Sequence, residues 1–329
     1  GDDEASSVWR SVKETGTLRI ASLYHEAKGN GWCDDGNHQK PTVEELAERN
    51  RIAKARAEKD EAEIESEREN TASMAIAIWK AATQVNDDHP YLVRKQVLPV
   101  ATLREIDVNA AVAILGYVPN SNGKPLTGGL LVVPVKQGNR LSTLELIDGG
   151  KRKAALAGRG TKTGGYWATD SLPKCDGKDV TLLVGEGVAT VLSAKEATGY
   201  LSIAALSSGN LPAVAQEMRE RYPLATQVIL ADLVKSTGEP DPQAIKAAMD
   251  VQGLLAVPVF GSDRDMDMTD FNDMALLSGL DEVALIISQA KLQVEESISW
   301  PEPQSLTTKI ESEPYPIDML PSTIRAAVE

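Results

Sequence analysis

VTLLVGEGVATVLSAKEATG, residues 180–199, runs from a short apolar stretch, through Glu186 between two glycines, into a helical pattern. Two further strand-then-helix patterns follow it along the chain. Strands that alternate with helices are typical of a parallel sheet with helices on both faces, so we predict an α/β fold. The predicted strands are 180–184, 201–206 and 228–231, and the predicted helices are 189–198, 212–221 and 242–251.

Acidic residues follow the apolar runs of this region. Glu186 follows the first run, Asp232 follows the run 227–231, and Thr269-Asp-Phe-Asn-Asp273 comes after a third run, 254–259. Because ligands of open α/β sheets bind outside the carboxyl ends of the strands, we expect these acids to meet at one edge. Carboxylates are ligands that divalent cations prefer. The expected site binds Mg²⁺ or Mn²⁺ through Glu186, Asp232, Asp270 and Asp273.

The order Glu186, Asp232 and then Asp270-Phe-Asn-Asp273 resembles the Toprim domain, the metal-binding fold of bacterial-type primases, topoisomerases and some nucleases. Several preceding segments resemble the region before Toprim in phage- and plasmid-type primase–helicases. These segments are 89–95, 130–135, 141–148, 151–153 and 164–167, and the resemblance covers about 88–292.

This resemblance implies a DNA primase, a nucleotidyltransferase that makes primers on single-stranded DNA from nucleoside triphosphates. It implies replication of a phage or other mobile genetic element, with a helicase domain or subunit as a partner. Glu186 would be the catalytic residue, either as a metal ligand or as a general acid/base, and both roles stay open.

One position departs from the Toprim pattern. The family usually has a second acid two residues after the Asp, whereas this chain reads Asp232-Leu-Val234. Mg²⁺ often takes only one or two carboxylates and completes its shell with water and phosphates. Weakened metal binding and no metal binding therefore both stay open.

Other interpretations compete with catalysis. Thr269 or Asp270 can simply cap the helix predicted at 271–277, and capping is the expected role of one of the two acids Asp270 and Asp273. A topoisomerase requires a nucleophilic tyrosine and a gate, and no segment suggests either. The stronger alternative is a catalytically weakened module that binds nucleic acid or a replication partner, because Val234 replaces an acid.

A basic region precedes the acidic one. Residues 89–165 hold eleven Lys or Arg against four acids, although the whole chain has a net charge of −14. A basic lobe beside an acidic, metal-binding lobe suits a polyanion, whereas ordinary solvated charges are the alternative. The expected nucleic-acid or nucleotide contacts in this lobe are Arg94, Lys95, Lys151, Arg152, Lys153 and Arg159.

Four further residues have two interpretations each. Tyr166 and Trp167 follow a glycine pair and either stack on a base or pack inside the protein. Ser207 and Ser208 lie between a strand and a helix, where they either meet a phosphate or cap the helix.

The remaining sequence suggests how the 329 residues are organised. We expect an irregular appendage at 1–41, a long charged helical arm at 42–87 opened by the Thr42-Val-Glu-Glu45 capping box, and a Pro-rich tail at 293–329. Between them we expect a mixed α and β basic lobe at 88–177, in which 103–115 has helical spacing, and the Toprim-like domain at 178–292. The two cysteines form no zinc or disulfide pattern, and no apolar run is long enough for a membrane span. We therefore expect a cytoplasmic protein of a bacterial host cell.

Overall fold

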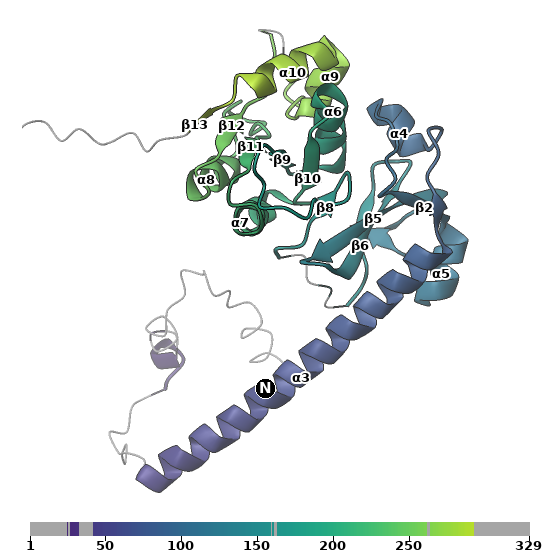
Figure 1. Cartoon of the computed structure of the whole chain (residues 1–329). Helices are drawn as coiled ribbons and strands as arrows, with labels where there is room; N and C mark the ends of the chain where they lie inside the picture. The colour runs from purple at the N-terminus through teal and green to yellow at the C-terminus, as the bar shows by residue number, and fades with distance from the viewer. Residues whose placement is uncertain are drawn as a thin grey trace, which may run out of the picture. The chain divides into compact units, whose positions relative to one another are not determined.

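A computed structural model describes residues 25, 27–32, 42–158, 160, 163–261 and 264–292 (Figure 1). The chain divides into two compact units, Gly1–Ser66 and Glu67–Glu329, and each is considered by itself. Predictions for Arg159, for most of 1–41 and for the tail at 293–329 lie outside the described residues.

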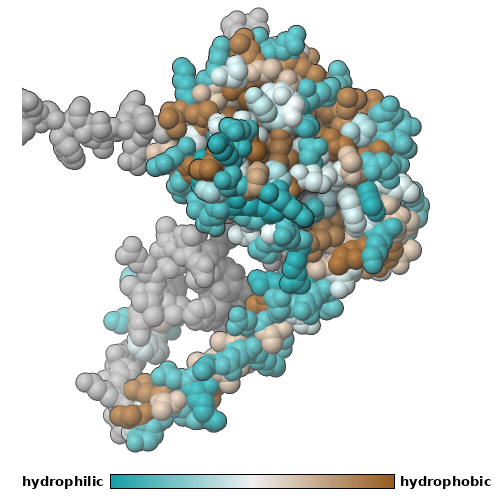
Figure 2. Space-filling model, in the orientation of Figure 1, coloured by the Kyte–Doolittle hydropathy of each residue, from teal (hydrophilic) through white to brown (hydrophobic). Residues whose placement is uncertain are grey.

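Helix α3, Val43–Ala81, is one continuous element that lies within the helical arm predicted at 42–87. Its start has the predicted capping box, because the Glu45 amide donates to Thr42 Oγ1 at 3.2 Å and the Thr42 amide donates to Glu45 Oε2 at 2.9 Å. In the first unit the helix is almost wholly exposed, and Figure 2 shows its mostly hydrophilic surface. In the second unit it buries Thr71, Ala75 and Ile78.

The basic lobe contains an antiparallel sheet in the order β1-β2-β5-β6-β7. The strands are β1 Thr83–Gln84, β2 Arg104–Asp107, β5 Gly129–Gln137, β6 Arg140–Asp148 and β7 Lys153–Ala155. Strands β5 and β6 pair along their length as an antiparallel hairpin. This lobe also contains helices α4 Pro90–Lys95 and α5 Val108–Leu115 and the small ribbon of β3 Asn120–Ser121 and β4 Lys124–Pro125.

The helix predicted over 103–115 is wrong in its first half. Residues Arg104–Asp107 form β2, which pairs with β5, and the helix begins only after Asp107. The Asp107 side chain caps that helix by accepting the Asn109 amide at 2.8 Å. Strand pairing with a distant segment overrides local helical spacing here.

The second sheet has the order β13-β12-β11-β9-β10-β8. Its four inner strands are parallel, whereas β8 Trp167–Ala168 and β13 Lys291–Leu292 pair antiparallel at the edges. The inner strands are β9 Thr181–Gly185, β10 Leu201–Ala204, β11 Thr226–Leu230 and β12 Leu254–Ala256.

Helices cover both faces of this parallel sheet, which confirms the predicted α/β architecture (Figure 1). On β9, Leu183 packs in one hydrophobic cluster, and Leu182 and Val184 pack in the other, as the alternation of side chains along a strand requires. One face carries α6 Val188–Thr198, α9 Phe271–Ser278 and α10 Leu280–Ser288, and the other carries α7 Leu211–Arg221 and α8 Pro242–Asp250.

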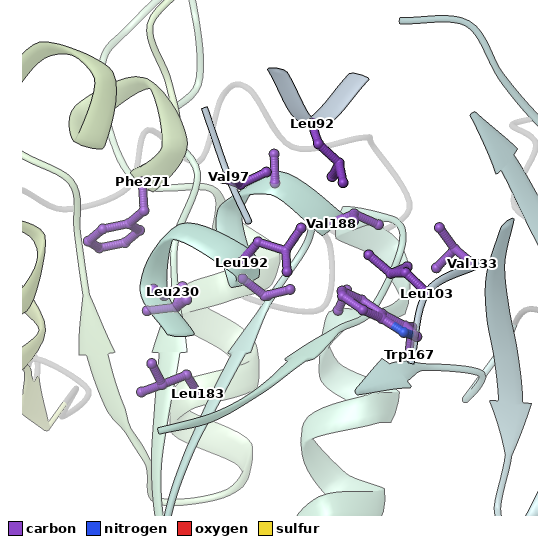
Figure 3. Packing of buried hydrophobic residues seen from close by; sticks show 14 of the residues in the cluster. Leu92, Val97, Leu103, Val133, Trp167, Leu183, Val188, Leu192, Leu230 and Phe271 are labelled. Atoms are coloured by element: carbon purple, nitrogen blue, oxygen red, sulfur yellow. The ribbon is translucent and has the colours of Figure 1, made fainter. Parts of the chain in front are cut away.

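The basic lobe and the parallel-sheet domain share a hydrophobic core. Leu92, Val97 and Leu103 of the basic lobe belong to the same buried cluster as Val188 and Leu192 of α6 (Figure 3). The basic lobe and the parallel-sheet domain therefore pack against each other through this cluster. In the described part of the chain, no helix is long and apolar enough to cross a membrane.

Candidate active site

Carboxyl groups converge at the carboxyl ends of the parallel strands. Burial, as the largest cause, and four neighbouring carboxyl groups together raise the pKa of Asp232 to about 8. Like charges produce such a shift only when they lie close together. The four neighbours are Asp270, Glu186, Asp241 and Asp273, in decreasing order of effect. The acids predicted from sequence therefore lie near one another and near Asp241, and we refer to these five residues as the acidic crevice.

Glu186 lies in the turn between β9 and α6. Burial raises the pKa of its carboxyl, whereas Lys153 and the backbone amide of Ser208 lower it. A Cβ atom on Gly185 would lie 3.2 Å from Val191 Cγ1, so a larger residue at this position would push Val191 of α6 away from the strand by a few tenths of an ångström. Glu186 is half-buried in this turn. Its carboxyl lies near Lys153 and also near other acids of the crevice.

Asp241 is a member of the crevice that the sequence interpretation missed. The chain leaves the crevice after Asp232 and returns nine residues later, and the Asp241 amide donates to the Asp232 carbonyl at 2.8 Å. The excursion is closed by hydrogen bonds between Val234 and Glu239 and between Val234 and Gly238. Asp241 Oδ2 accepts a hydrogen bond from Ser208 Oγ at 2.9 Å. In the sequence, this acid before Pro242 looks like an ordinary helix cap, which it also is.

Asp270 and Asp273 form a reciprocal capping box at the start of α9. Asp270 Oδ1 accepts the Asp273 amide at 2.8 Å, and Asp273 Oδ2 accepts the Thr269 amide at 2.9 Å. Both acids therefore cap α9, whereas the sequence interpretation expected this role for only one of them. Burial and the nearby Asp273 raise the pKa of Asp270, so its carboxyl still contributes to the crevice.

The donor set of the crevice suits a hard divalent cation, because every side-chain donor is a carboxylate. Asp232 Oδ1 is buried and, within the described residues, accepts no hydrogen bond. In that same part of the chain, no three His, Cys, Asp or Glu side chains are arranged to hold a metal ion by themselves. Carboxylate oxygens are among the ligands that Mg²⁺ takes, and this ion often uses only one or two carboxylates and fills its shell with water and phosphate oxygens.

Lysines of the basic lobe face the acidic crevice. Lys153 on β7 lowers the pKa of Glu186, and Lys95 at the end of α4 lies 3.7 Å from Asp273 Oδ1 and lowers the pKa of Asp270. Lys151, in the loop between β6 and β7, has a φ of 73°, in the left-handed region that non-glycine residues rarely adopt. The structure thus brings the predicted basic residues Lys95 and Lys153 to the predicted acids.

Arg94 and Arg152 hold the β6–β7 loop. The Arg94 guanidinium donates to the Gly149 carbonyl and lies over the Tyr91 ring, 5.6 Å from its centre. Arg152 donates to the buried Asp148 carboxylate at 2.7 Å and to Thr127 at 2.9 Å.

Tyr166 and Trp167 are buried, each with 1% of its surface exposed. The Tyr166 hydroxyl donates to the Gly138 carbonyl at 2.8 Å, and Trp167 Nε1 donates to the Thr102 carbonyl at 3.3 Å. Stacking on a base is therefore the wrong interpretation of these two residues, because neither ring offers a free face. Their apolar area and their polar tips are both used within the protein.

Ser208 lies beside the acidic crevice, since its hydroxyl donates to Asp241 and its amide lowers the pKa of Glu186. Ser207 is the residue before the short 3-10 helix Ser208–Asn210 and makes no side-chain cap. The side chain of Asn210 anchors the loop instead. Its Oδ1 accepts the Gly164 amide, and its Nδ2 donates to the carbonyls of Gly165 and Ala205.

A groove of about 720 Å³ lies elsewhere on the domain. Its walls include Thr226 and Leu254, which begin β11 and β12, whereas the acids follow the opposite ends of these strands. The groove is therefore separate from the acidic crevice.

Comparison with known proteins shows a similarity to a DNA primase. No family model matches the chain. A segment of 85 residues is 38% identical to the DNA primase TraC of Escherichia coli. Part of this chain is homologous to a DNA primase. The match covers 24% of this chain and 8% of that primase.

Solved primase structures superpose loosely on the chain. The RNA polymerase domain of the Mycobacterium tuberculosis primase DnaG gives a TM-score of 0.45 at 12% identity, covering 68% of this chain and 84% of that one. The Aquifex aeolicus primase, with its zinc-binding and RNA polymerase domains, gives 0.47 at 12% identity over 83% of this chain and 68% of that one. A DnaG catalytic domain bound to single-stranded DNA gives 0.43 at 11% identity over 69% and 80%. No conclusion about function rests on likenesses this distant.

Proposed function

We propose that this chain is the primer-synthesising part of a Toprim-type DNA primase. It would extend primers from nucleoside triphosphates on single-stranded DNA, during replication of a phage or other mobile element in the cytoplasm of a bacterial host. A helicase domain or subunit is the partner that such a primase would work with. The observation that carries the proposal is the convergence of Glu186 and Asp232 with lysines from a separate lobe.

The acidic crevice would hold Mg²⁺ or Mn²⁺ through Glu186 and Asp232, with Asp241, Asp270 or Asp273 completing the set. When bound, the ion supplies charge neutralisation at the reacting phosphates. Lys95 and Lys153 would hold the phosphates of the strand or nucleotide beside the acids, because both already lie close to them. Burial raises the pKa of Glu186, which favours a role in carrying a proton at the site.

A second function has its own support, namely a binding module without catalysis. Val234 stands where the resemblance expects an acid, and Asp270 and Asp273 are already used in capping α9. Such a module would bind nucleic acid through the lysines and would not depend on a divalent cation.

Metal titration separates the two functions. Calorimetry with Mn²⁺, single-stranded DNA and a nucleoside triphosphate would compare the parent chain with Glu186→Gln and Asp232→Asn. Asp250→Asn is the matched control, because Asp250 is an acid of α8 that pairs with Lys246. Loss of binding in the two crevice variants alone supports the primase. DNA binding that needs no metal and survives both changes supports the binding module.

A further inference from the structure

Asn272 lies between the two acids that cap α9, and its side chain is buried. Only 1% of its surface is exposed, and the neighbouring Phe271 belongs to the hydrophobic cluster that also contains Leu192 of α6 (Figure 3). An amide group in apolar surroundings is costly unless it forms hydrogen bonds. The hydrogen bonds of Asn272 therefore show what this side chain contributes to the site.

Asn272 donates two hydrogen bonds, both to residues outside α9. Its Nδ2 donates to the Lys95 carbonyl of α4 at 2.7 Å and to Ser193 Oγ of α6 at 3.0 Å. Its Oδ1 is buried and accepts no hydrogen bond within the described residues. The two donated bonds are therefore what compensates the burial of this amide. They link α9 to the helix that follows Glu186 and to the basic lobe.

Lys95 is attached to α9 at two points. Its carbonyl accepts the bond from Asn272, and its Nζ lies 3.7 Å from Asp273 Oδ1. Lys95 is the last residue of α4, and carbonyls at a helix end lack intrahelical partners, so Asn272 supplies a donor that α4 cannot. The side chains of Lys95 and Asp273 are 20% and 21% exposed, so solvent screens this ion pair less than a surface pair.

We propose that Asn272 is a positioning residue, which holds Lys95 of the basic lobe in a fixed place beside the acidic crevice. This inference rests on the proposed function, since Lys95 would hold phosphates there. Asn272 itself touches no substrate, because its side chain is buried and both of its donated bonds go to the protein. Its effect on a bound triphosphate passes through Lys95.

The test is a double-mutant cycle with Asn272→Leu and Lys95→Met. Calorimetry would measure the affinity for ATP in the presence of Mn²⁺ for the parent, for both single variants and for the double variant. Thermal unfolding would be recorded for each protein. Such a cycle separates a residue that acts through Lys95 from one that acts independently, because only coupled residues have non-additive effects.

Gln227→Leu is the matched control. Gln227 is also an amide with 1% of its surface exposed, and it lies near the start of β11, whereas Asp232 follows the other end of that strand. Its replacement also removes the hydrogen-bonding groups of a buried amide, but it does so away from the acidic crevice.

We expect Lys95→Met to weaken ATP binding about tenfold, because a hydrogen bond to a charged phosphate is lost. Asn272→Leu should weaken ATP binding by about threefold to tenfold, since it can at most remove the contribution of Lys95. The double variant should bind ATP no more weakly than Lys95→Met alone. Gln227→Leu should lower the unfolding temperature about as much as Asn272→Leu does and leave the affinity for ATP unchanged.

Three results would overturn the inference. If Asn272→Leu binds ATP like the parent while Lys95→Met does not, Asn272 has no positioning role and the proposed function stands. Losses that multiply in the double variant, or an equal loss in Gln227→Leu, would mean that Asn272 only stabilises the core. A parent chain that binds no ATP with Mn²⁺ present would remove the proposed function and the role of Asn272 together.

Discussion

The acidic crevice and the lysine loop are opposite in charge and also in the way that the fold supports them. The acids follow strands of a parallel sheet, and burial and mutual repulsion raise the pKa of Asp232, Asp270 and Glu186. The lysines come from an antiparallel lobe, and Lys151 and Lys153 are largely exposed. The crevice is thus electrostatically unfavourable by itself when its acids are ionised, whereas the lysine loop is not. The negative charge of the crevice must therefore be compensated by a bound metal cation, by protonation of a carboxyl group or by the lysines.

The largest effect should come from the centre of the crevice. Asp232→Asn keeps the size of the side chain and removes its charge, so metal-dependent primer synthesis should fall by at least about a hundredfold, more than loss of a supporting residue costs. A primer-extension assay with labelled nucleotides checks it, with Asp250→Asn as the control. Unchanged synthesis in Asp232→Asn would show that the crevice is not the active site.

The second effect is on stability without metal. A carboxyl whose folded pKa is raised stabilises the protein fully below its unfolded pKa, near 4, and loses that contribution as the pH rises through the folded value of about 8. Metal-free protein should therefore lose stability from about pH 5 to pH 8, with a slope of up to about 1.4 kcal/mol per pH unit for one proton.

Denaturant unfolding at several pH values measures this slope. Asp232→Asn should flatten the slope, because it removes the group that titrates. Mn²⁺ should stabilise the parent more at pH 8 than at pH 5. If the free energy of unfolding of the parent did not change between pH 5 and pH 8, the carboxyl groups of the crevice would not repel one another as described.

A smaller effect is expected at Asp241. Asn caps helices about as well as Asp, so Asp241→Asn should leave α8 stable while it removes one negative charge. We expect Mn²⁺ affinity to fall about tenfold, as for other residues that support a metal site. The double variant Val234→Asp with Asp241→Asn should regain part of the loss. Calorimetry measures both, and an unchanged affinity in Asp241→Asn would mean that Asp241 serves only as a cap.

The smallest effect should come from the lysines, because each is one of several. Lys153→Met should weaken single-stranded DNA binding roughly two- to threefold and reduce the slope of log K against log salt by about 0.7. Lys246→Met is the control, since Lys246 pairs with Asp250 on α8. Equal losses in both variants would indicate a diffuse effect of net charge.

Arg94 and Tyr166 show where sequence interpretation reaches its limit. Both stood among candidate contacts to nucleic acid because of residue type and neighbourhood. Arg94 donates to Gly149, and Tyr166 donates to Gly138, so each is used inside the protein. Residue type identifies what a side chain can bind, whereas only the fold shows which partner it already has.

The sequence by itself determined the strand–helix alternation of the second domain and the placement of Glu186 and Asp232 after strands. These features are local, because hydrophobic periodicity and the residue after a buried run depend on neighbours in the chain. Only the tertiary structure decided that 104–107 is a strand and that Asp241 returns to Asp232. These features join residues far apart in sequence, so they depend on packing and hydrogen bonds that form only when the chain is folded.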